Sequence, residues 1–568
     1  MDERPARRRE RLLVLVASAL LLLPGLGELG LWAPDEPRYA QIAEELRSFV
    51  HGPSGLLVLH LNGDVYDQKP PLYFWAAALA GAPGGRVTER AARLPSALAG
   101  VACVLLTMRL GERLLPARSA LLGALFLLTT LEFAHLSRRV QLDIVLTLFE
   151  LTAFYAFVRL EQRAGSRTRN LILLHAALGL AVLTKGPVGW LPLLVMAVTL
   201  SLDGRLPTLR GLFPAWSPLL WLAPPLAWLA AAAWFAPAGF LDSAVVQNLW
   251  GRMAEGTAHP RPFYYYAYQF PIDVLPWSLL WPLIAYVALQ QVFARSNTAE
   301  DQRRSWRFLL AWVGVPFVVF SLFAGKRGLY LTPVAPAAAL LSAEALRLFL
   351  LERTSLPRTF SWPVFALALA LFAVGVRLAL FPLVSGVSLP WSFGAAVAAV
   401  GAGAALSWRA FGRSDPTREP VGSERAVARR IGVAVAGAYA LLAAAFLLLY
   451  PALDPEKSPR PIALAAAALV PEGEPIGLLG SPALTGGLVY YGGRAVLELD
   501  SPVEARAFLA RGGRAIVLEA KKLDRLRAVV PVEVRAHARA EDRTLVVVTP
   551  QGEIAQGLRV PPPPELPP

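Results

Sequence analysis

The chain has 568 residues, of which 55% are hydrophobic and 17% are charged. Its mean hydropathy of +0.48 is far above that of soluble globular proteins, which excludes a soluble enzyme and indicates an integral membrane protein. The formal net charge of +14 comes mostly from arginines that recur between alternate hydrophobic stretches. Such basicity indicates membrane topology and not a nucleic-acid-binding face.

The hydrophobic stretches predict about 13 transmembrane helices, because about 20 apolar residues are needed to cross a bilayer. The first stretch follows the basic start "MDERPARRRERL" and resembles a signal peptide. No small-x-small cleavage site precedes residue 35, so we interpret it as an uncleaved first helix. The predicted spans are approximately residues 12–32, 92–111, 119–136, 141–158, 170–184, 187–202, 216–236, 273–294, 308–324, 330–349, 361–383, 389–408 and 431–450.

The loops between these spans predict the orientation of the chain. With the N-terminus inside, every inside loop contains arginine, as in "RLEQRAGSRTR" at 159–169, which is the pattern of cytoplasmic loops. The outside segments are then loop 33–91, the turns near 138, 185 and 326, and loop 237–272. An odd number of spans puts the C-terminus outside.

Residues 456–568 differ in pattern from the membrane part, 1–455. Short β-like runs such as "PIGLLG", "AVLELD", "AIVLEA" and "TLVVVTP" alternate with helical runs, which predicts a small external α/β domain. Its Gly-Gly pairs at 486, 492 and 512 form no GxGxxG after a strand and are interpreted as turns. The tail "PPPPELPP" is expected to be extended and disordered.

The single cysteine, Cys103, lies in an apolar run. Because it is the only cysteine, no intrachain disulfide can form and a Cys-based metal site is excluded. We interpret Cys103 as a small buried hydrophobic residue.

The first external loop opens with "DEPRYAQIAEELRSFV". Its apolar residues, among them Tyr39, Ile42 and Leu46, share one helical stripe, which predicts a short helix along the membrane interface. Asp35 and Glu36 fit its N-terminus and Pro37 its first turn. A simply capped helix and a functional acidic pair are equally good interpretations of this stretch.

Three other stretches have a structural interpretation beside the functional one. In "YDQKPPLYFW", Lys69 precedes two prolines and an aromatic cluster; taken alone, a lysine reaching from an aromatic belt to the interface is favoured. Lys185 in "LTKGP" is interpreted as part of a turn between two spans. "FYYYAYQF" also fits an interfacial aromatic belt.

Taken together and in order, these motifs resemble the lipid-linked-sugar glycosyltransferases related to aminoarabinose lipid A transferase and the protein O-mannosyltransferases. The resemblance runs over "DEPRYA", "YDQKPPLYFW", "ERAARLPSALAG", "RRVQLDIVLT", "LTKGPVGWLP", "HPRPFYYYAYQFP" and "GKRGLYLTPVAPA". It covers approximately residues 12–345, and implies an all-α polytopic GT-C fold. It also implies a bacterial inner-membrane location with a cytoplasmic N-terminus and a periplasmic C-terminal domain.

The resemblance also implies a site. It puts Asp35, with Glu36 and Asp143, at the catalytic centre, and Lys69 on the phosphate of the lipid-linked donor. Further residues implied in binding donor or substrate are Arg38, His259, Arg261, Lys326, Arg327 and Tyr330.

One position departs from the family pattern. Gln68 stands where close relatives often have a glutamate that, with the loop histidine, has been associated with a metal. We therefore expect no certain cofactor, leave the metal unassigned, and allow His259 a hydrogen-bonding or structural role.

The predicted function is transfer of a sugar from a polyprenyl phosphate to an acceptor on the external face, with inversion at the anomeric carbon implied by the resemblance. The acceptor is an envelope glycolipid such as lipid A or, alternatively, a protein hydroxyl; no nucleic acid is expected as a partner. A lipid-linked-sugar flippase is a rival from another class. It is disfavoured because no internal repeat is visible and because the ionisable groups gather on one side. A non-catalytic scaffold leaves Asp35 and Lys69 unexplained.

Overall fold

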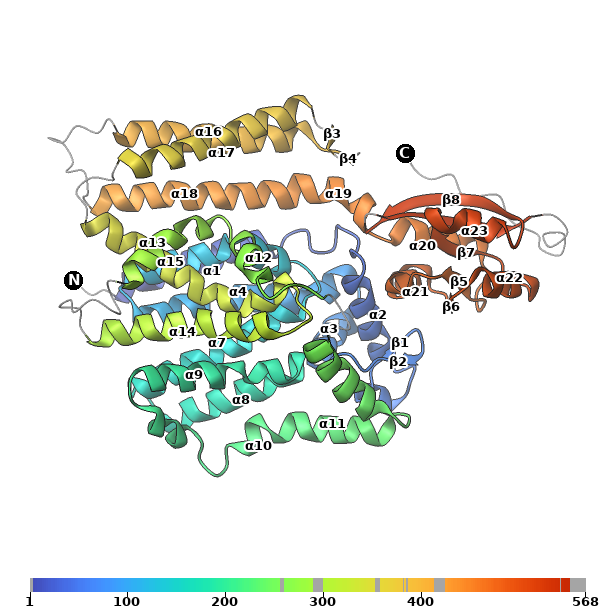
Figure 1. Ribbon diagram of the computed structural model, residues 1–568, viewed down its shortest axis with the longest axis horizontal. Helices are drawn as coiled ribbons and strands as arrows, with labels where there is room; N and C mark the ends of the chain where they lie inside the picture. Colours follow the sequence, from blue (N-terminus) through green and yellow to red (C-terminus); the bar gives the residue numbers. More distant parts are fainter. Residues whose placement is uncertain are drawn as a thin grey trace.

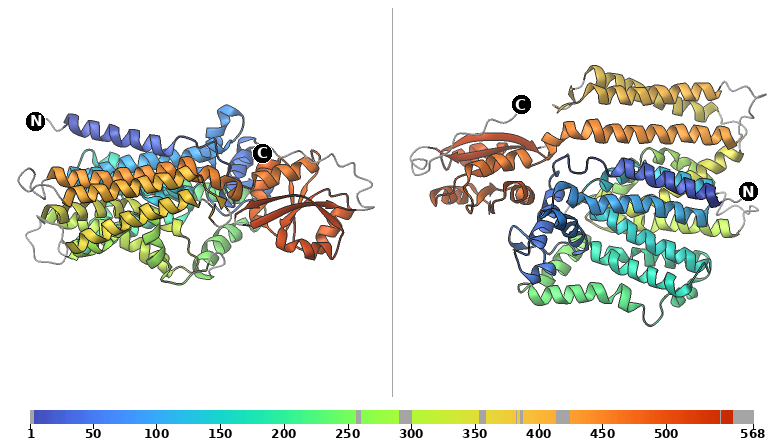
Figure 2. Two further views of the ribbon diagram at one scale, coloured as in Figure 1. Left: turned by 90° about the horizontal axis from the view of Figure 1, so that it is seen from above. Right: turned by 180° about the vertical axis from the view of Figure 1, so that it is seen from behind.

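The structure is a computed structural model that describes residues 4–255, 260–289, 300–352, 358–381, 383–384, 387–412, 424–541 and 543–551. It is mostly helical. Long helices lie side by side in a bundle, and a smaller part with the principal sheet lies at one end of that bundle (Figures 1 and 2). The N-terminus lies at the opposite end (Figure 1).

Within the described residues, each predicted hydrophobic stretch contains helix over part or all of its length. Side-chain caps explain two of the starts: Thr88 accepts a hydrogen bond from the Ala91 N–H before α4, and Ser166 accepts one from Arg169 before α8. The principal helices of the bundle are α1 (Arg4–Leu22), α4 (Glu89–Leu114), α5 (Ala117–Leu128), α6 (Leu131–Ser137), α7 (Leu142–Glu161), α8 (Arg167–Lys185), α9 (Leu191–Leu202), α10 (Pro218–Trp221), α11 (Ala223–Phe235), α12 (Tyr265–Asp273), α13 (Trp281–Ala288), α14 (Glu300–Leu322), α15 (Ala335–Glu352), α16 (Arg358–Leu380), α17 (Trp391–Gly412), α18 (Glu424–Ala444) and α19 (Tyr450–Lys457).

Several predicted spans are interrupted. Among the described residues, four helices are long and apolar enough to cross a membrane, or up to six if each bent pair counts as one span. The predicted span 119–136, for example, consists of α5 and α6, and the chain bends by 63° between these two helices. The number of thirteen spans therefore stays a prediction, whereas the helical membrane character is evident.

The first external loop contains α2 (Asp35–Arg47), the short strands β1 (His60–Leu61) and β2 (Asp64–Val65), and α3 (Leu72–Gly81). The predicted helix at 35–47 is present, with Asp35 and Glu36 in its first turn. Its apolar stripe of Tyr39, Ile42 and Leu46 is buried in the protein core. The expectation that this stripe faces the membrane interface was wrong, because other parts of the protein cover it.

The C-terminal part holds a five-stranded mixed sheet of order β6-β5-β7-β9-β8. β5 (Ile476–Leu479), β6 (Val496–Leu499), β7 (Ile516–Glu519) and β9 (Arg543–Pro550) match the four predicted β-like runs, and β8 (Val532–Ala540) completes the sheet. β5 pairs in parallel with β6 and β7, whereas β9 pairs antiparallel with β7 and β8. The accompanying helices are α20 (Arg460–Leu469), α21 (Thr485–Gly492), α22 (Pro502–Ala510) and α23 (Leu523–Arg527).

The glycine pairs of this part have different roles. Gly493 and Gly512 have positive φ angles of 61° and 97° and lie at turns, as predicted. Gly486 and Gly487 instead lie inside α21, so the turn prediction was wrong for this pair. The C-terminal tail "PPPPELPP", which is predicted to be disordered, lies outside the described residues.

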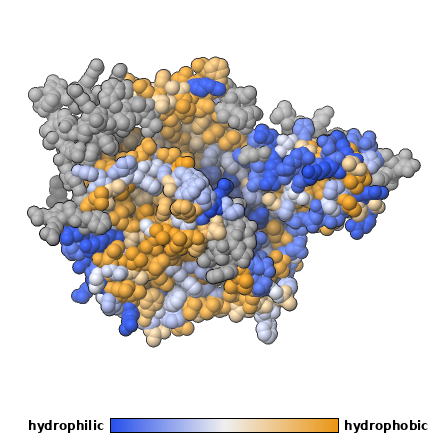
Figure 3. All heavy atoms as spheres, viewed as in Figure 1, coloured by the Kyte–Doolittle hydropathy of each residue, from blue (hydrophilic) through white to orange (hydrophobic). Residues whose placement is uncertain are grey.

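The two parts of the molecule differ in the hydropathy of their surfaces. Hydrophobic residues cover much of the helix bundle, whereas the C-terminal part is largely hydrophilic (Figure 3). This distribution fits a bundle surrounded by lipid and a C-terminal part in water.

Candidate active site

The two neighbouring acids at the start of α2 are held in different ways. Glu36 is only 1% exposed, and Arg93 forms a two-pronged ion pair with it, with both nitrogen–oxygen distances at 2.9 Å. Arg139 lies 3.2 Å from the same carboxylate, and the backbone N–H groups of Trp32 and Val140 each donate to it at 2.8 Å. Both oxygens of Glu36 are thus occupied by donors from three segments of the chain.

Asp35 is more accessible. Its Oδ2 is 3.0 Å from Arg327 Nη2 and its Oδ1 is 3.5 Å from Arg38 Nη1. Burial raises the pKa of Asp35, but the positive charges of Arg327, Arg38 and Lys69 outweigh it and hold the pKa below the ordinary value. Asp35 is therefore an ionised carboxylate at neutral pH, surrounded by cations.

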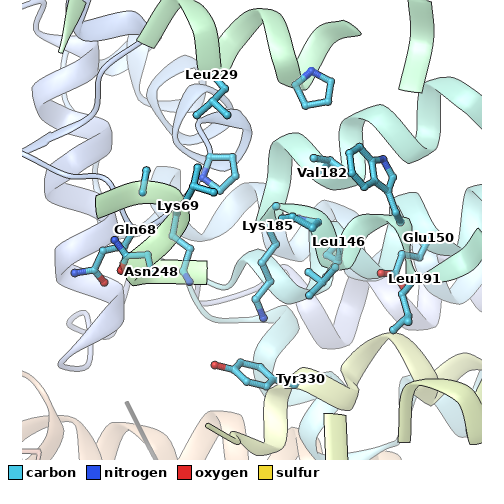
Figure 4. A pocket seen from close by; sticks show the side chains of 18 of the residues that line it. Gln68, Lys69, Leu146, Glu150, Val182, Lys185, Leu191, Leu229, Asn248 and Tyr330 are labelled. Atoms are coloured by element: carbon cyan, nitrogen blue, oxygen red, sulfur yellow. The ribbon is translucent and has the colours of Figure 1, made fainter. Parts of the chain in front are cut away.

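A cavity of about 300 Å³ opens next to this cluster. One wall carries Lys69 and Gln68 from the first external loop, and the other carries Lys185 and Tyr330 (Figure 4). The rest of the lining is largely apolar and comes mainly from the loop and helices around α8, α9, α11 and α14, for example Val182, Leu191, Leu226, Leu229 and Phe320. The cavity thus joins two lysines, with the carboxyl groups of Asp67 and Glu150 also in the lining, to an apolar groove.

Lys185, which the sequence interpretation assigns to a turn, is the last residue of α8 and lines the cavity. Its Nζ forms an ion pair with Asp143 in the first turn of α7, and it lies 4.6 Å from the centroid of the Tyr330 ring. Lys69 and Lys185 project in the same direction, toward Tyr330 (Figure 4). Glu150, also on α7, lines the cavity as well and was not predicted.

Two predicted residues of the later loops, Lys326 and Arg261, lie close to the cavity but differ in what they contact. Lys326 is buried and its Nζ donates to the backbone carbonyls of Arg261 and Phe323. Arg261 is exposed, and its guanidinium lies 5.9 Å from the centroid of the Tyr265 ring. A β-bridge between Pro260 and Gly325 joins their two segments. Neither Lys326 nor Arg261 lines the cavity.

The prediction for His259 lies outside the described residues. Within the described part of the chain, no group of three or more His, Cys, Asp or Glu side chains converges on a point where a metal could bind. Gln68 lines the cavity beside Lys69, and an uncharged amide there is a weaker metal ligand than a carboxylate.

This arrangement has a clear chemical capacity. Two ammonium groups at the mouth of an apolar groove can bind the phosphate of an amphipathic lipid and stabilise negative charge that develops on it. An ionised carboxylate beside them can accept a proton or stabilise a developing positive charge.

The chain is similar in sequence to known transferases over somewhat less than two thirds of its length. The family model described as dolichyl-phosphate-mannose-protein mannosyltransferase matches residues 9–203. The undecaprenyl phosphate-alpha-4-amino-4-deoxy-L-arabinose arabinosyl transferase of Aeromonas salmonicida is 30% identical over 64% of this chain and 64% of its own length. The protein of the same name from Pseudomonas paraeruginosa is 32% identical over 60% of each chain. The chain thus spans less than two thirds of the length of these two relatives.

The fold is similar to solved structures over nearly the whole chain. The crystal structure of ArnT from Cupriavidus metallidurans bound to undecaprenyl phosphate matches with a TM-score of 0.74 and 22% identity, over 94% of this chain and 97% of that one. The archaeal oligosaccharyltransferase AglB from Archaeoglobus fulgidus matches with a TM-score of 0.50 and 13% identity, over 92% of this chain and 70% of that one. The described fold is therefore ArnT-like over nearly the whole chain.

Proposed function

We propose that this chain is an aminoarabinose transferase-like member of the GT-C superfamily, a proposal that the sequence and fold similarities support. We further propose that it transfers a sugar from a polyprenyl phosphate to an acceptor at the external membrane face. The observation that carries this proposal is the cavity that joins Lys69 and Lys185 to an apolar groove beside Asp35. A polyprenyl phosphate has the same division into an anionic head and an apolar tail.

The proposed orientation follows from the site. The predicted first external loop contributes Asp35 and Lys69, and the C-terminal sheet lies at the same end of the bundle (Figure 1). We propose a membrane unit over 1–455 with about 13 spans, and an external domain over 456–568. The N-terminus is then cytoplasmic and the C-terminal domain periplasmic, in a bacterial inner membrane.

In the proposed reaction the bond between the anomeric carbon and the phosphate oxygen breaks, and the bonding electrons stay with the phosphate. The product is a polyprenyl phosphate monoester with an additional negative charge, which the Lys69 and Lys185 ammonium groups stabilise. The acceptor oxygen forms the new bond to the anomeric carbon from the opposite face, which inverts its configuration.

The acceptor determines what Asp35 does. A hydroxyl acceptor loses a proton during attack, and the ionised Asp35 carboxylate takes it. A phosphate acceptor has no such proton, and Asp35 then orients the sugar or stabilises positive charge on its ring. In either case Arg327 and Arg38 hold the carboxylate in place.

The other predicted acids act in this proposal through their partners. Glu36 ties the start of α2 to Arg93 and Arg139 and so positions Asp35. Asp143 holds Lys185 at the cavity wall. Tyr330 lies beneath the Lys185 ammonium and limits the directions that it can take.

The acceptor class that we propose is an envelope glycolipid, because the more extensive sequence similarity is to enzymes named as arabinosyl transferases. Transfer to a protein hydroxyl is the second candidate, favoured by the mannosyltransferase family model over residues 9–203.

The test is to incubate the purified protein with labelled polyprenyl phosphate sugars and with either glycolipid or unfolded protein as acceptor. We expect stoichiometric release of the free lipid phosphate and transfer of the label to the glycolipid. Label on the protein would select the second candidate. Movement of intact labelled lipid between leaflets of a liposome, without release, would instead identify a flippase.

A further inference from the structure

Helix α1 begins at the end of the bundle that lies away from the C-terminal part (Figure 1). The first turns of α1 line a second cavity, opposite the proposed active site. It has a volume of about 370 Å³ between α1, α4 and α7. Four arginines line it, Arg7, Arg11, Arg109 and Arg113, against one carboxylate, Glu112. The lining is therefore strongly cationic.

Two of these guanidinium groups are fixed by neighbours. Arg11 forms a two-pronged pair with Glu112, with distances of 3.1 and 2.6 Å. Arg113 donates to the Gln162 side chain at 3.2 Å, and Gln162 donates back to the Arg113 carbonyl at 2.8 Å. The Arg113 guanidinium also lies 5.6 Å from the Tyr155 ring centroid. Such fixed guanidinium groups suit planar recognition of an oxyanion.

Positive charge remains after these contacts. Glu112 is the only carboxylate in the lining, and Arg109 is exposed and forms no ion pair with any residue that the structure describes. General topology explains why arginines gather at this end, but it does not explain a cavity that orients several of them.

An apolar surface begins where the arginines of α1 end. Arg7, Arg11 and Leu15 are spaced four residues apart and so follow one stripe of the helix. Leu15 is 40% exposed, and its neighbours Leu12, Val16 and Leu20 are 58%, 46% and 64% exposed. An acyl chain can lie along this surface while its head group occupies the cavity.

We propose that this cavity binds the phosphate of an anionic phospholipid, whose acyl chains lie along the exposed face of α1. The four guanidinium groups recognise the phosphate, and the leucines distinguish a lipid from a free anion. Basic pockets between membrane helices are a known mode of lipid recognition. The proposal does not depend on the proposed catalytic function, because none of these residues lies near Asp35 or Lys69.

The test is native mass spectrometry of the detergent-purified full chain, titrated with phosphatidylglycerol or phosphatidylcholine. The test variant is Arg109→Gln/Arg113→Gln, with Arg109→Gln alone as a milder change at an exposed position. The matched control is Arg163→Gln/Arg169→Gln, which removes the same charge from two exposed positions, one in the loop after α7 and one in the first turn of α8.

We expect the wild type to retain phosphatidylglycerol in preference to phosphatidylcholine. The double variant should lose about 10-fold in affinity for phosphatidylglycerol, and the single variant should lose less. The control should match the wild type. Equal loss in the control would overturn the proposal, because it would reduce the effect to general surface charge. Equal retention of both lipids would also overturn it. Complete displacement of the lipid by millimolar inorganic phosphate would contradict the role of the leucines and leave only an anion site.

Discussion

At the scale of single residues, the difference between Asp35 and Glu36 is a difference in what surrounds each carboxylate. Glu36 is fully enclosed by two arginines and two backbone N–H groups. Because loss of one partner leaves buried charge without compensation, we expect Glu36→Gln to lower the free energy of unfolding by about 3–5 kcal/mol. A thermal denaturation series in detergent measures this, with Glu44→Gln, which breaks the half-buried pair with Arg47, as the milder control. Equal midpoints for the two variants would contradict the anchoring role of Glu36.

The same enclosure predicts a pH dependence. Burial raises the pKa of Glu36, but Arg139 and Arg93 outweigh it and lower the pKa to about 2. A carboxyl whose pKa is lower in the folded state stabilises the fold above its unfolded pKa, and this contribution is lost as the pH falls through the folded value. We therefore expect the wild-type thermal midpoint to fall more steeply than that of Glu36→Gln between about pH 4.5 and pH 2. Parallel curves would exclude Glu36 as the source.

Lys185 and Lys326 are both basic residues near turns, yet only Lys185 lines the cavity. We expect Lys185→Met to raise the donor KM about 10- to 100-fold, since one charge-assisted hydrogen bond contributes about 1.5–3 kcal/mol. Lys326→Met, whose ammonium contacts backbone carbonyls, should lower thermal stability and leave the donor KM unchanged. Donor titrations on both variants measure this, and the reverse ranking would contradict the assignment of Lys185 to the donor phosphate.

The two lysines of the cavity, Lys69 and Lys185, differ in whether their place in the site could be predicted from the sequence. The ordered sequence motifs identify Lys69 as a candidate, and its side chain lines the cavity. The chain does turn between α8 and α9, where Gly186 ends α8 with φ of 79°, but Lys185 itself is the last residue of the helix. The direction of the Lys185 side chain depends on how α7 packs against α8, which local sequence does not encode.

At the scale of elements, α21 of the C-terminal part packs directly on the first turn of α2. A Cβ on Gly486 would lie 2.5 Å from the Arg38 Cα, too close for any residue but glycine. A Cβ on Gly492, at the other end of α21, would have its nearest neighbour at 3.5 Å, an ordinary contact. The Gly486 position thus sets how closely α21 approaches the helix that carries Asp35.

We therefore expect Gly486→Ala to shift α2 and to lower kcat about 10- to 100-fold, with little change in donor KM, because small displacements of a reacting group have such effects. Gly492→Ala should keep wild-type kcat. Alanine favours a helix over glycine by about 1 kcal/mol, so helix propensity does not oppose either change. Unchanged kcat in Gly486→Ala, with the thermal midpoint preserved, would exclude this positioning contact.

Prediction of the elements depended on the type of signal. The apolar runs of β5, β6, β7 and β9 were recognised. The run "VEVRAHARA" that forms β8 alternates apolar and polar residues in the manner of a half-exposed strand, but it was missed because its charged residues concealed the pattern. The Gly-Gly pair at 486 was interpreted as a turn because close helix packing requires a partner that sequence does not reveal.

At the scale of the whole molecule, the C-terminal part and the first external loop are linked by contacts more than 400 residues apart. The Tyr490 hydroxyl of α21 donates to the backbone carbonyl of Val87 at 2.7 Å, and Asn62 exchanges two hydrogen bonds with the backbone of Val496 on the edge strand β6. Hydropathy and loop charge were sufficient to predict a helical membrane protein with a separate C-terminal region. They could not predict this docking, because it arises from specific polar pairs and not from composition.

In the proposed mechanism, Asp35 takes part in sugar transfer and is not needed to bind the donor. The most direct measurement is donor affinity and turnover on one preparation of Asp35→Asn, with the wild type beside it. We expect that polyprenyl phosphate sugar still binds to the variant, while turnover falls about 100-fold or more, because a positioned carboxylate is removed from the reaction. Turnover at the wild-type rate would exclude Asp35 from sugar transfer.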